Sequence, residues 1–296
     1  MEATEKRVVV VLADISGYTQ FMVENQMSAI HGQQCITYLI ETLIREIDIP
    51  LRLQEIEGDA LFLYAEDPGN DEAWQTALTQ IPQKLLRFFD AFYDGAVLAM
   101  EATPCKCAIC RNSRELALKI VVHSGTAVFH QIGGFNKVSG PDVILAHRLL
   151  KNTVPDNEYL LMSEAAYHDI GQKMDGPFLE SRESYDGFGD IKTFVRYNRD
   201  IKEKHLDALY KQPPAAMALR AEGYALVATA GLFPAMLKEL RSPTNKTSLM
   251  RRIGFSLLLV VRAPVTIMMY MFGAPRRLFG FRNNRTQLSE SKTEST

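Results

Sequence analysis

The sequence has few cysteines, a single tryptophan and almost no net charge. Its 296 residues include four cysteines, and the formal net charge is −2. Four cysteines, three of them packed into one short stretch, do not form the framework of a small secreted disulfide protein. The near-neutral charge gives no electrostatic argument for nucleic-acid binding, so we expect no nucleic-acid partner.

The first residues also lack the apolar segment of a signal peptide. Residues 1–6 are polar and partly acidic, which favours a cytoplasmic location for the N-terminal part. Acidic residues are likewise missing between Arg241 and Ser289, where arginine recurs. This change in composition predicts three parts, which are a globular domain over 1–200, a basic, apolar helical region over 201–285, and a disordered tail over 286–296.

The globular part begins with a strand pattern that ends on a carboxylate. Residues 8–13 are apolar and mainly β-branched, which predicts a strand buried on both faces. Asp14 follows, and Ser16-Gly17 allows a sharp turn into a helix over 18–24. An acid beside the free N–H groups of a turn suits a phosphate-bound metal ion. The alternative is a solvated acid in a capped turn.

Apolar patterns along the rest of the globular part predict alternating strands and helices. We expect a half-buried strand over 51–57 that turns at Gly58-Asp59 into a buried strand, and a long helix near 72–100 that is kinked or split at Pro82. Further expected elements are a hairpin turning at Ser124-Gly125, a helix from Pro141, strands at 159–162 and 194–197, and a helix capped by Ser163. Their order predicts an α+β fold, an α/β sandwich with a mostly antiparallel sheet.

Four motifs agree in order and spacing with one known family. They are Asp14-Ile15-Ser16-Gly17-Tyr18-Thr19, Glu55-Ile56-Glu57-Gly58-Asp59-Ala60, His123-Ser124-Gly125 and the helix from Gly140 to Arg148. Together they resemble the class III nucleotidyl cyclase catalytic domain. The Cys-x-Cys-x-x-Cys pattern and the helix sequence resemble an uncharacterised bacterial branch, catalogued as a domain of unknown function. The resemblance implies a ferredoxin-like core over about 7–197 and a homodimer whose protomers share each active site.

The same resemblance implies that Asp14 and Asp59, with the Ile15 carbonyl oxygen, hold two Mg²⁺ or Mn²⁺ ions. Such ions polarise the α-phosphate of a purine nucleoside triphosphate and lower the pKa of its ribose 3′-hydroxyl. The alternative for Asp59 is an ordinary Gly-Asp turn residue. The nucleotide is then expected to contact the turn after Asp14, at Ser16, Gly17, Tyr18 and Thr19.

Two further residues, Glu55 and Lys137, stand where the family reads the purine base. A carboxylate accepts hydrogen bonds from N1–H and the 2-amino group of guanine, and an ammonium donates to O6. This pair is complementary to guanine rather than adenine. The alternative is an ordinary cross-strand ion pair.

The helix from Pro141 matches the family's transition-state helix at one of two positions. Arg148 stands where an arginine neutralises charge on the phosphates. Ile144 stands where the family has asparagine, and the loss of one such hydrogen bond typically costs about 10²–10³ in rate. The sequence therefore predicts a weak nucleotidyl cyclase that prefers GTP, or a catalytically degenerate module that binds nucleotide or metal. A non-enzymatic membrane-associated scaffold is the third hypothesis.

The clustered cysteines predict a structural zinc ion. Cys105, Cys107 and Cys110 offer three thiolates at spacing typical of a metal site. A structural Zn²⁺ takes four ligands, and the fourth comes from Cys35, His123, His130 or a second subunit. The alternative is a loop of reduced cysteines.

An apolar segment of the basic region has the length of a membrane span. Residues 253–273 are mostly apolar, but Arg262 and Pro264 lie at the centre, and a central arginine costs roughly 2.5–3.5 kcal/mol on insertion scales. A re-entrant or interfacial helix on anionic lipid is therefore favoured, which places the protein at the inner face of the cell membrane. The alternative is a helical extension packed on the globular part.

We predict that the chain truncated after Asn198 stays in solution, whereas the full chain partitions onto vesicles containing anionic lipid. The physical reason is that the arginine-rich apolar segment is attracted to negative head groups and buries apolar side chains between them. Vesicle co-sedimentation of the two proteins measures the difference. Equal partitioning would contradict an anchor in residues 240–282.

Overall fold

The structure is a computed structural model, and it describes residues 3–24, 29–102, 115–198 and 204–205. The chain divides into two units, Met1–Ala96 with Arg111–Leu206, and Val97–Cys110 with Asp207–Thr296. Nearly all described residues belong to the first unit. The expected zinc ligands Cys105, Cys107 and Cys110, the basic helical region apart from residues 204–205, and the tail lie outside the described residues.

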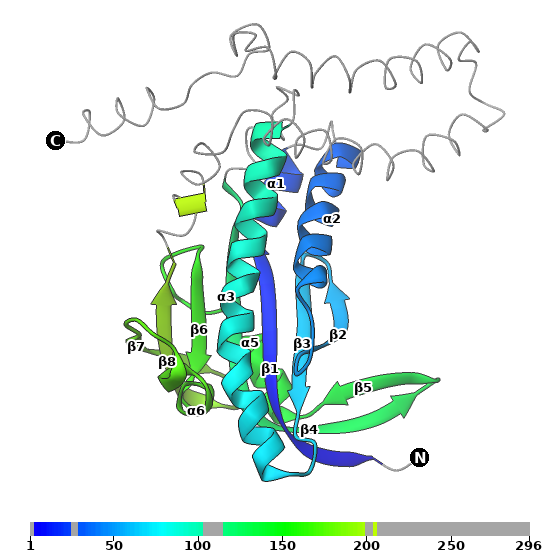
Figure 1. The fold of residues 1–296 in the computed structure, drawn as a ribbon, viewed down its shortest axis with the longest axis vertical. Coiled ribbons are helices and arrows are strands. Elements are labelled where there is room, and N and C mark those ends of the chain that lie inside the picture. Colours follow the sequence, from blue (N-terminus) through cyan, green and yellow to red (C-terminus); the bar gives the residue numbers. More distant parts are fainter. Residues whose placement is uncertain (1–2, 25–28, 103–114, 199–203, 206–296) are drawn as a thin grey trace, which may run out of the picture. The chain divides into compact units, whose positions relative to one another are not determined.

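The described part of the chain forms one sheet of eight strands (Figure 1). Seven strands follow the order β2-β3-β1-β4-β6-β8-β7, and β5 also pairs with β4. Only β4 and β6 pair in parallel, which confirms the mostly antiparallel sheet within these residues. The strands are β1 (Thr4–Ser16), β2 (Arg52–Glu57), β3 (Ala60–Glu66), β4 (Ala117–Ile132), β5 (Phe135–Ser139), β6 (Tyr159–Ser163), β7 (Leu179–Tyr185) and β8 (Gly189–Tyr197).

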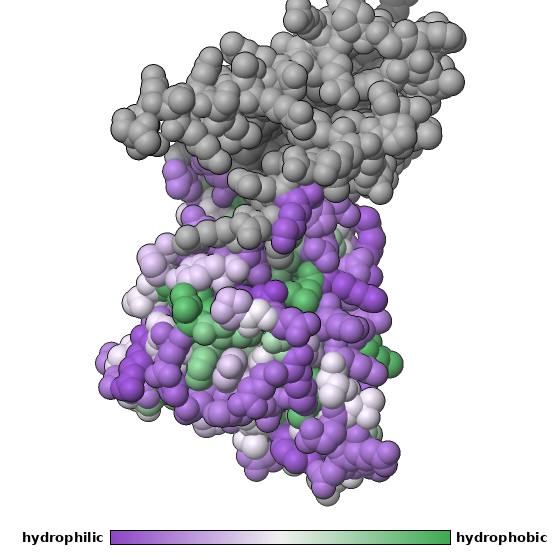
Figure 2. Space-filling model, turned by 60° about the vertical axis from the view of Figure 1, so that its left-hand side comes forward, coloured by the Kyte–Doolittle hydropathy of each residue, from purple (hydrophilic) through white to green (hydrophobic). Residues whose placement is uncertain are grey.

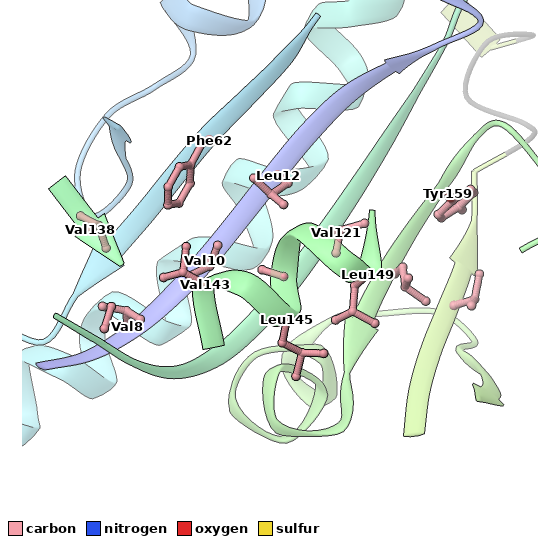
Figure 3. Close-up of a cluster of buried hydrophobic side chains, with 14 residues drawn as sticks. Val8, Val10, Leu12, Phe62, Val121, Val138, Val143, Leu145, Leu149 and Tyr159 are labelled. Carbon is pink, nitrogen blue, oxygen red and sulfur yellow. The ribbon is translucent and has the colours of Figure 1, made fainter. Parts of the chain in front are cut away.

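Helices lie on both faces of this sheet, which confirms a mixed α/β fold. Helices α2 (Ala29–Arg45) and α3 (Asp71–Ala102) lie on one face, and α5 (Pro141–Leu149) lies on the other (Figures 1 and 3). Two shorter helices follow strand ends, α1 (Tyr18–Glu24) after β1 and α6 (Glu164–Asp169) after β6. Among the described residues, no helix combines the length and apolar character needed to cross a membrane.

Strand β1 is the centre of the core, and its residues alternate between the two faces. Val8, Val10 and Leu12 belong to the buried cluster that packs against α5 (Figure 3). The intervening residues, such as Val11, are equally buried and point to the opposite face. Asp14 is two residues beyond Leu12, so its carboxylate lies on the α5 face.

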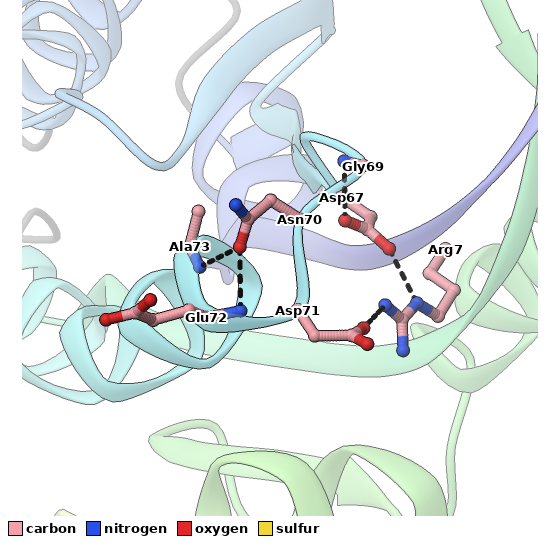
Figure 4. Close-up of polar contacts among 7 residues, drawn as sticks. All are labelled: Arg7, Asp67, Gly69, Asn70, Asp71, Glu72 and Ala73. Atoms are coloured by element: carbon pink, nitrogen blue, oxygen red, sulfur yellow. Dashed lines mark hydrogen bonds and ion pairs between the residues drawn. The ribbon is translucent and has the colours of Figure 1, made fainter.

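An ionic contact ties the start of β1 to the loop before α3. The Arg7 guanidinium lies 2.6 Å from the Asp67 carboxylate and 2.5 Å from that of Asp71 (Figure 4). Asn70 caps the helix, because its side-chain oxygen accepts hydrogen bonds from the backbone N–H groups of Glu72 and Ala73. These contacts fix where β3 ends and α3 begins.

The expected hairpin at Ser124-Gly125 is wrong, because strand β4 continues through both residues. Both residues continue the β1 ladder, with Ser124 opposite Val9 and Gly125 opposite Val8. The hairpin instead turns at Gly133-Gly134, where φ is +57° and +87°. Two successive positive φ values are typical of a type I′ turn, and they join β4 to β5.

Three other expectations need correction. Strand β2 has no buried face, since Leu53 and Ile56 are 37% and 48% exposed at the sheet edge, and a register shift interrupts its ladder. Helix α3 continues through Pro82 without splitting. Strand β7, whose sequence is largely polar, was not expected. The Gly58-Asp59 turn, helix α1 and the Ser163 cap are confirmed.

The reason for glycine at position 125 lies in the ladder of β4. This strand pairs with β6 as far as Val122 and with β5 from Val128 onward. In the interval, the Thr126 backbone N–H donates to the Asp142 carboxylate over 2.6 Å. A Cβ at position 125 would overlap that carboxylate, so only glycine admits the contact.

We expect Gly125→Ala to destabilise the fold by about 1–3 kcal/mol, because the added Cβ would overlap the Asp142 carboxylate and displace it from buried His123 and from the Thr126 N–H. Urea unfolding measures the loss. Thr126→Ala is the matched control, since it keeps the backbone donor, and it should change stability by less than about 0.5 kcal/mol. Equal stability of Gly125→Ala and wild type would contradict the close approach of Asp142.

Candidate functional site

Two carboxylates lie together where β1 ends and the β2–β3 hairpin turns. Asp14 is in register with Ala60, the residue that follows Asp59. Burial, together with the nearby charge of Asp14, raises the pKa of Asp59 to about 6. The structure therefore brings the two predicted metal-binding acids within electrostatic range of each other.

A lysine that the sequence did not single out completes this cluster. Lys119 of β4 is in register with Asp14, and its Nζ lies 2.9 Å from Asp14 Oδ2, with both side chains mostly buried. In the sequence, Leu118-Lys119-Ile120 reads as an ordinary alternating strand. Only the register of β1 against β4 reveals the contact. We call Asp14, Asp59 and Lys119 the acid–lysine cluster.

The acid–lysine cluster fits a divalent cation in its donor chemistry. Two carboxylates face one ammonium, so the cluster carries an excess of negative charge when Asp59 is ionised. Carboxylate oxygens are the ligands that Mg²⁺ and Mn²⁺ prefer. No group of three or more acidic, histidine or cysteine side chains is arranged to hold a metal within the described ranges. A bound ion would therefore also need oxygens from the backbone, water or a nucleotide.

The turn after Asp14 has the predicted geometry. Gly17 has φ of +87°, and its carbonyl accepts the Phe21 N–H over 2.9 Å at the start of α1. Ile15 is buried and its side chain points to the face opposite Asp14, so its backbone carbonyl is the group left to meet an ion. Contacts of Ser16, Gly17, Tyr18 and Thr19 with a nucleotide stay a prediction.

Helix α5 presents Arg148 to solvent. Arg148 is exposed, and its guanidinium makes no hydrogen bond or ion pair with any other described residue. Ile144, one turn earlier on the same face, is 52% exposed. His147 lies between them, with Nδ1 3.5 Å from the Glu57 carboxylate. Arg148 is thus available to an anion from outside its own chain.

His123 belongs to a buried polar network. Its Nδ1 lies 2.7 Å from Ser163 Oγ and its Nε2 lies 3.3 Å from Asp142 Oδ1. Burial lowers the His123 pKa, although Asp142 opposes the shift. The network holds the first turn of α5, and a role of His123 as the fourth zinc ligand stays a prediction.

Glu55 and Lys137 meet each other directly. The Lys137 ammonium lies 2.6 Å from the Glu55 carboxylate, and both side chains are about half exposed. The ion pair considered from the sequence is therefore present. A role of these two residues in reading a base stays a prediction.

Comparison with known protein families gives a match over the middle of the chain. Residues 36–159 match the family model described as "Protein of unknown function (DUF2652)", which confirms the expected resemblance to an uncharacterised family. The chain is also 29% identical over 143 residues to a protein of Mycobacterium tuberculosis (strain ATCC 25618 / H37Rv) described as uncharacterized. That alignment covers 48% of this chain and 64% of the relative, so the chain spans less than two thirds of the relative's length.

Solved structures of cyclases are among those that the chain resembles. The adenylyl cyclase CyaB from P. aeruginosa is 14% identical to this chain, and the superposition has a TM-score of 0.42. The aligned part is 68% of this chain and 99% of the CyaB chain. The guanylate cyclase domain of RhGC from Catenaria anguillulae, in complex with GTP, is 18% identical. The aligned part is 66% of this chain and 99% of that domain, and the TM-score is 0.42.

We predict that Asp59→Asn stabilises the protein at pH 8 by about 1–2 kcal/mol, after allowance for solvent screening. The folded chain holds the Asp59 proton up to pH about 6, because the pKa of this carboxyl is raised from its ordinary value of 3.8. Stability from this group is therefore present at low pH and is lost as pH rises through about 6. Urea unfolding at pH 4 and pH 8 measures the effect, which should vanish at pH 4. Exposed Asp186→Asn is the control, and a pH profile unchanged by Asp59→Asn would contradict the assignment.

Proposed function

We propose that the protein binds a purine nucleoside triphosphate together with a divalent cation at the acid–lysine cluster. The observation that carries this proposal is the Asp14–Lys119 ion pair at the end of β1, with Asp59 within electrostatic range of it. Burying two carboxylates together is costly, as the raised pKa of Asp59 indicates. A divalent cation would relieve this cost, and it would attract the triphosphate that the cation accompanies.

Lys119 has a second role in this proposal. In the absence of a cation, its ammonium neutralises Asp14. Once the carboxylate has another positive partner, the ammonium can turn to a phosphate oxygen and form a charge-assisted hydrogen bond. The free N–H groups of the turn at Gly17 would face the same phosphates. The cluster therefore exchanges an internal ion pair for contacts with ligand.

We further propose that the bound nucleotide is cyclised slowly in a homodimer. The ribose 3′-oxygen would bond to the α-phosphorus as its proton leaves to solvent, and the bond from the α-phosphorus to the β-phosphate oxygen would break to release pyrophosphate. The divalent ion would polarise the α-phosphate and make the ribose 3′-hydroxyl more acidic. The Arg148 guanidinium makes no hydrogen bond or ion pair within the described part of its own chain, so it is available to neutralise phosphate charge in the site of a second copy. Ile144 beside it can neither donate nor accept a hydrogen bond, so the ribose would be less well oriented.

A regulatory module that binds nucleotide without turnover is the second candidate. The exposed Ile144 favours it, because an alkyl side chain stands where the resemblance predicts a hydrogen-bonding one. In this candidate, the acid–lysine cluster still binds cation and triphosphate, and the occupied domain signals through a partner. The expected zinc at Cys105, Cys107 and Cys110 and the peripheral membrane location are compatible with both candidates.

The experiment is to titrate the full chain with GTP and ATP in the presence of Mn²⁺ and to assay for cyclic product. Asp14→Asn and Asp59→Asn should each weaken Mn²⁺-dependent GTP binding at least about tenfold, which corresponds to ~1.4 kcal/mol. If Glu55 and Lys137 open to read guanine, GTP should bind at least about tenfold more tightly than ATP. Unchanged Mn²⁺-dependent binding in both aspartate variants would reject the cluster as the site.

Ile144→Asn separates the two candidates. It should raise cyclic-nucleotide formation with little change in affinity, because it adds a contact made mainly in the transition state. Ile144→Val is the control, since it keeps an apolar side chain. Tight GTP binding without product from any of the three proteins would favour the regulatory module.

A further inference from the structure

A histidine late in the described part of the chain is held between two carboxylates. His205 Nδ1 lies 3.0 Å from Asp94 Oδ1, and His205 Nε2 lies 3.1 Å from Asp90 Oδ1. The two aspartates stand one turn apart on α3, so they lie on the same side of the helix. The His205 side chain is 19% exposed, whereas both aspartate side chains are more than half exposed. We call these three residues the His205 clamp.

The geometry of the His205 clamp fits only the doubly protonated form of the imidazole ring. A neutral ring carries one N–H and one lone pair, so one of its nitrogens would direct a lone pair at a carboxylate oxygen. The imidazolium has an N–H on each nitrogen and can donate to both aspartates. Hydrogen bonds between ionised groups are also stronger than neutral ones. The clamp therefore depends on a proton that histidine ordinarily gains or loses between about pH 5 and 8.

The other titratable groups around the His205 clamp keep their charge across this pH range. The Tyr93 ring of α3 lies 6.5 Å from the imidazole between centroids, and burial raises the pKa of its phenol far above the usual range. From α2, Tyr38 lies within electrostatic range of Asp94 and of Arg45, and burial raises the Tyr38 pKa as well. Lys204, the preceding residue, is exposed. Within the described ranges, the charged groups that meet the ring are thus the two aspartates.

The His205 clamp joins two segments of the first unit that both lead into the second. Helix α3 passes into the second unit at Val97, soon after Asp94, and the chain enters that unit again at Asp207, soon after His205. Asp94 and His205 are 111 residues apart in the sequence. A contact between them fixes the point from which the C-terminal region, residues 207–296, continues.

We propose that the His205 clamp is a proton-controlled attachment of the C-terminal region to helix α3. While the ring is doubly protonated, it holds the segment before Asp207 against Asp90 and Asp94. When the ring loses a proton, one hydrogen bond becomes a repulsion between lone pairs, and the segment is released as pH rises. This inference does not depend on the proposed function, because it uses neither the acid–lysine cluster nor helix α5.

The test measures backbone amide exchange of the full chain at pH 6 and pH 8.5 by mass spectrometry. The double variant Asp90→Asn/Asp94→Asn leaves the peptide around His205 unchanged in sequence, so its exchange rate compares directly with that of wild type at each pH. At pH 6 we expect this peptide to exchange about three- to tenfold faster in the variant, as for the loss of two exposed ion pairs. At pH 8.5 the two rates should agree within about twofold, because histidine ordinarily carries no charge there.

The matched control is Asp186→Asn/Asp190→Asn, which removes the same charge from two exposed aspartates and should exchange like wild type at both pH values. Peptides of α3 report whether each variant keeps its fold. His205→Gln leaves α3 unaltered and cannot take up a proton, so its exchange, corrected for intrinsic rates, should not differ between pH 6 and pH 8.5. Equal exchange of wild type and the Asp90→Asn/Asp94→Asn variant at pH 6, or a difference of the same size at both pH values, would overturn the proposal.

Discussion

The antiparallel pairing of β1 with β4 is the constraint on which the rest of the structure depends. It runs without interruption from Thr4 opposite Phe129 to Ser16 opposite Ala117. A shift by one residue would turn every side chain to the other face. Val8, Val10 and Leu12 would then leave the α5 cluster, and Asp14 would lose Lys119. The register of one strand pair thus fixes the core and the candidate site together.

The long β4 also explains how α5 is placed. Strand β4 pairs first with β6 and farther along with β5. Between these two pairings, the Asp142 carboxylate takes the place of a strand and accepts a backbone hydrogen bond from β4. The donor is the Thr126 N–H, and the aspartate that accepts lies in the first turn of α5. The helix that presents Arg148 is therefore positioned by a break in the sheet. On the face that Figure 2 shows, the described residues are mainly hydrophilic, with hydrophobic patches between them.

The sequence predicted the local features well and the long-range ones poorly. The buried strand before Asp14, the Gly58-Asp59 turn and the helix after Pro141 follow from patterns within a few residues, and the structure has all three. Ser124-Gly125 was misread because glycine is typical both of turns and of close approach. Its reason is a carboxylate that lies later in the chain.

The candidate site shows the same division. Asp14 and Asp59 could be found from motifs, because each ends a recognisable element. Lys119 could not, since a lysine in an alternating strand gives no sign of which neighbour it meets. The His205 clamp was equally hidden, because His205 lies 111 and 115 residues after the two aspartates that hold it. Residues that act through tertiary contacts become visible only in the folded chain.

The open edges of the sheet restrict how two copies of the chain can associate. Strands β2 and β7 are the outermost strands of the main order, and among the described residues each has one edge that no other strand pairs with and on which another strand could add. Both edges carry exposed charges, including Arg52 and Glu57 on β2 and Glu180 and Arg182 on β7, and β2 is also irregular. Such features discourage edge-to-edge addition and aggregation. Growth of the sheet from one molecule to the next is therefore disfavoured, and association is directed to the helix-bearing faces.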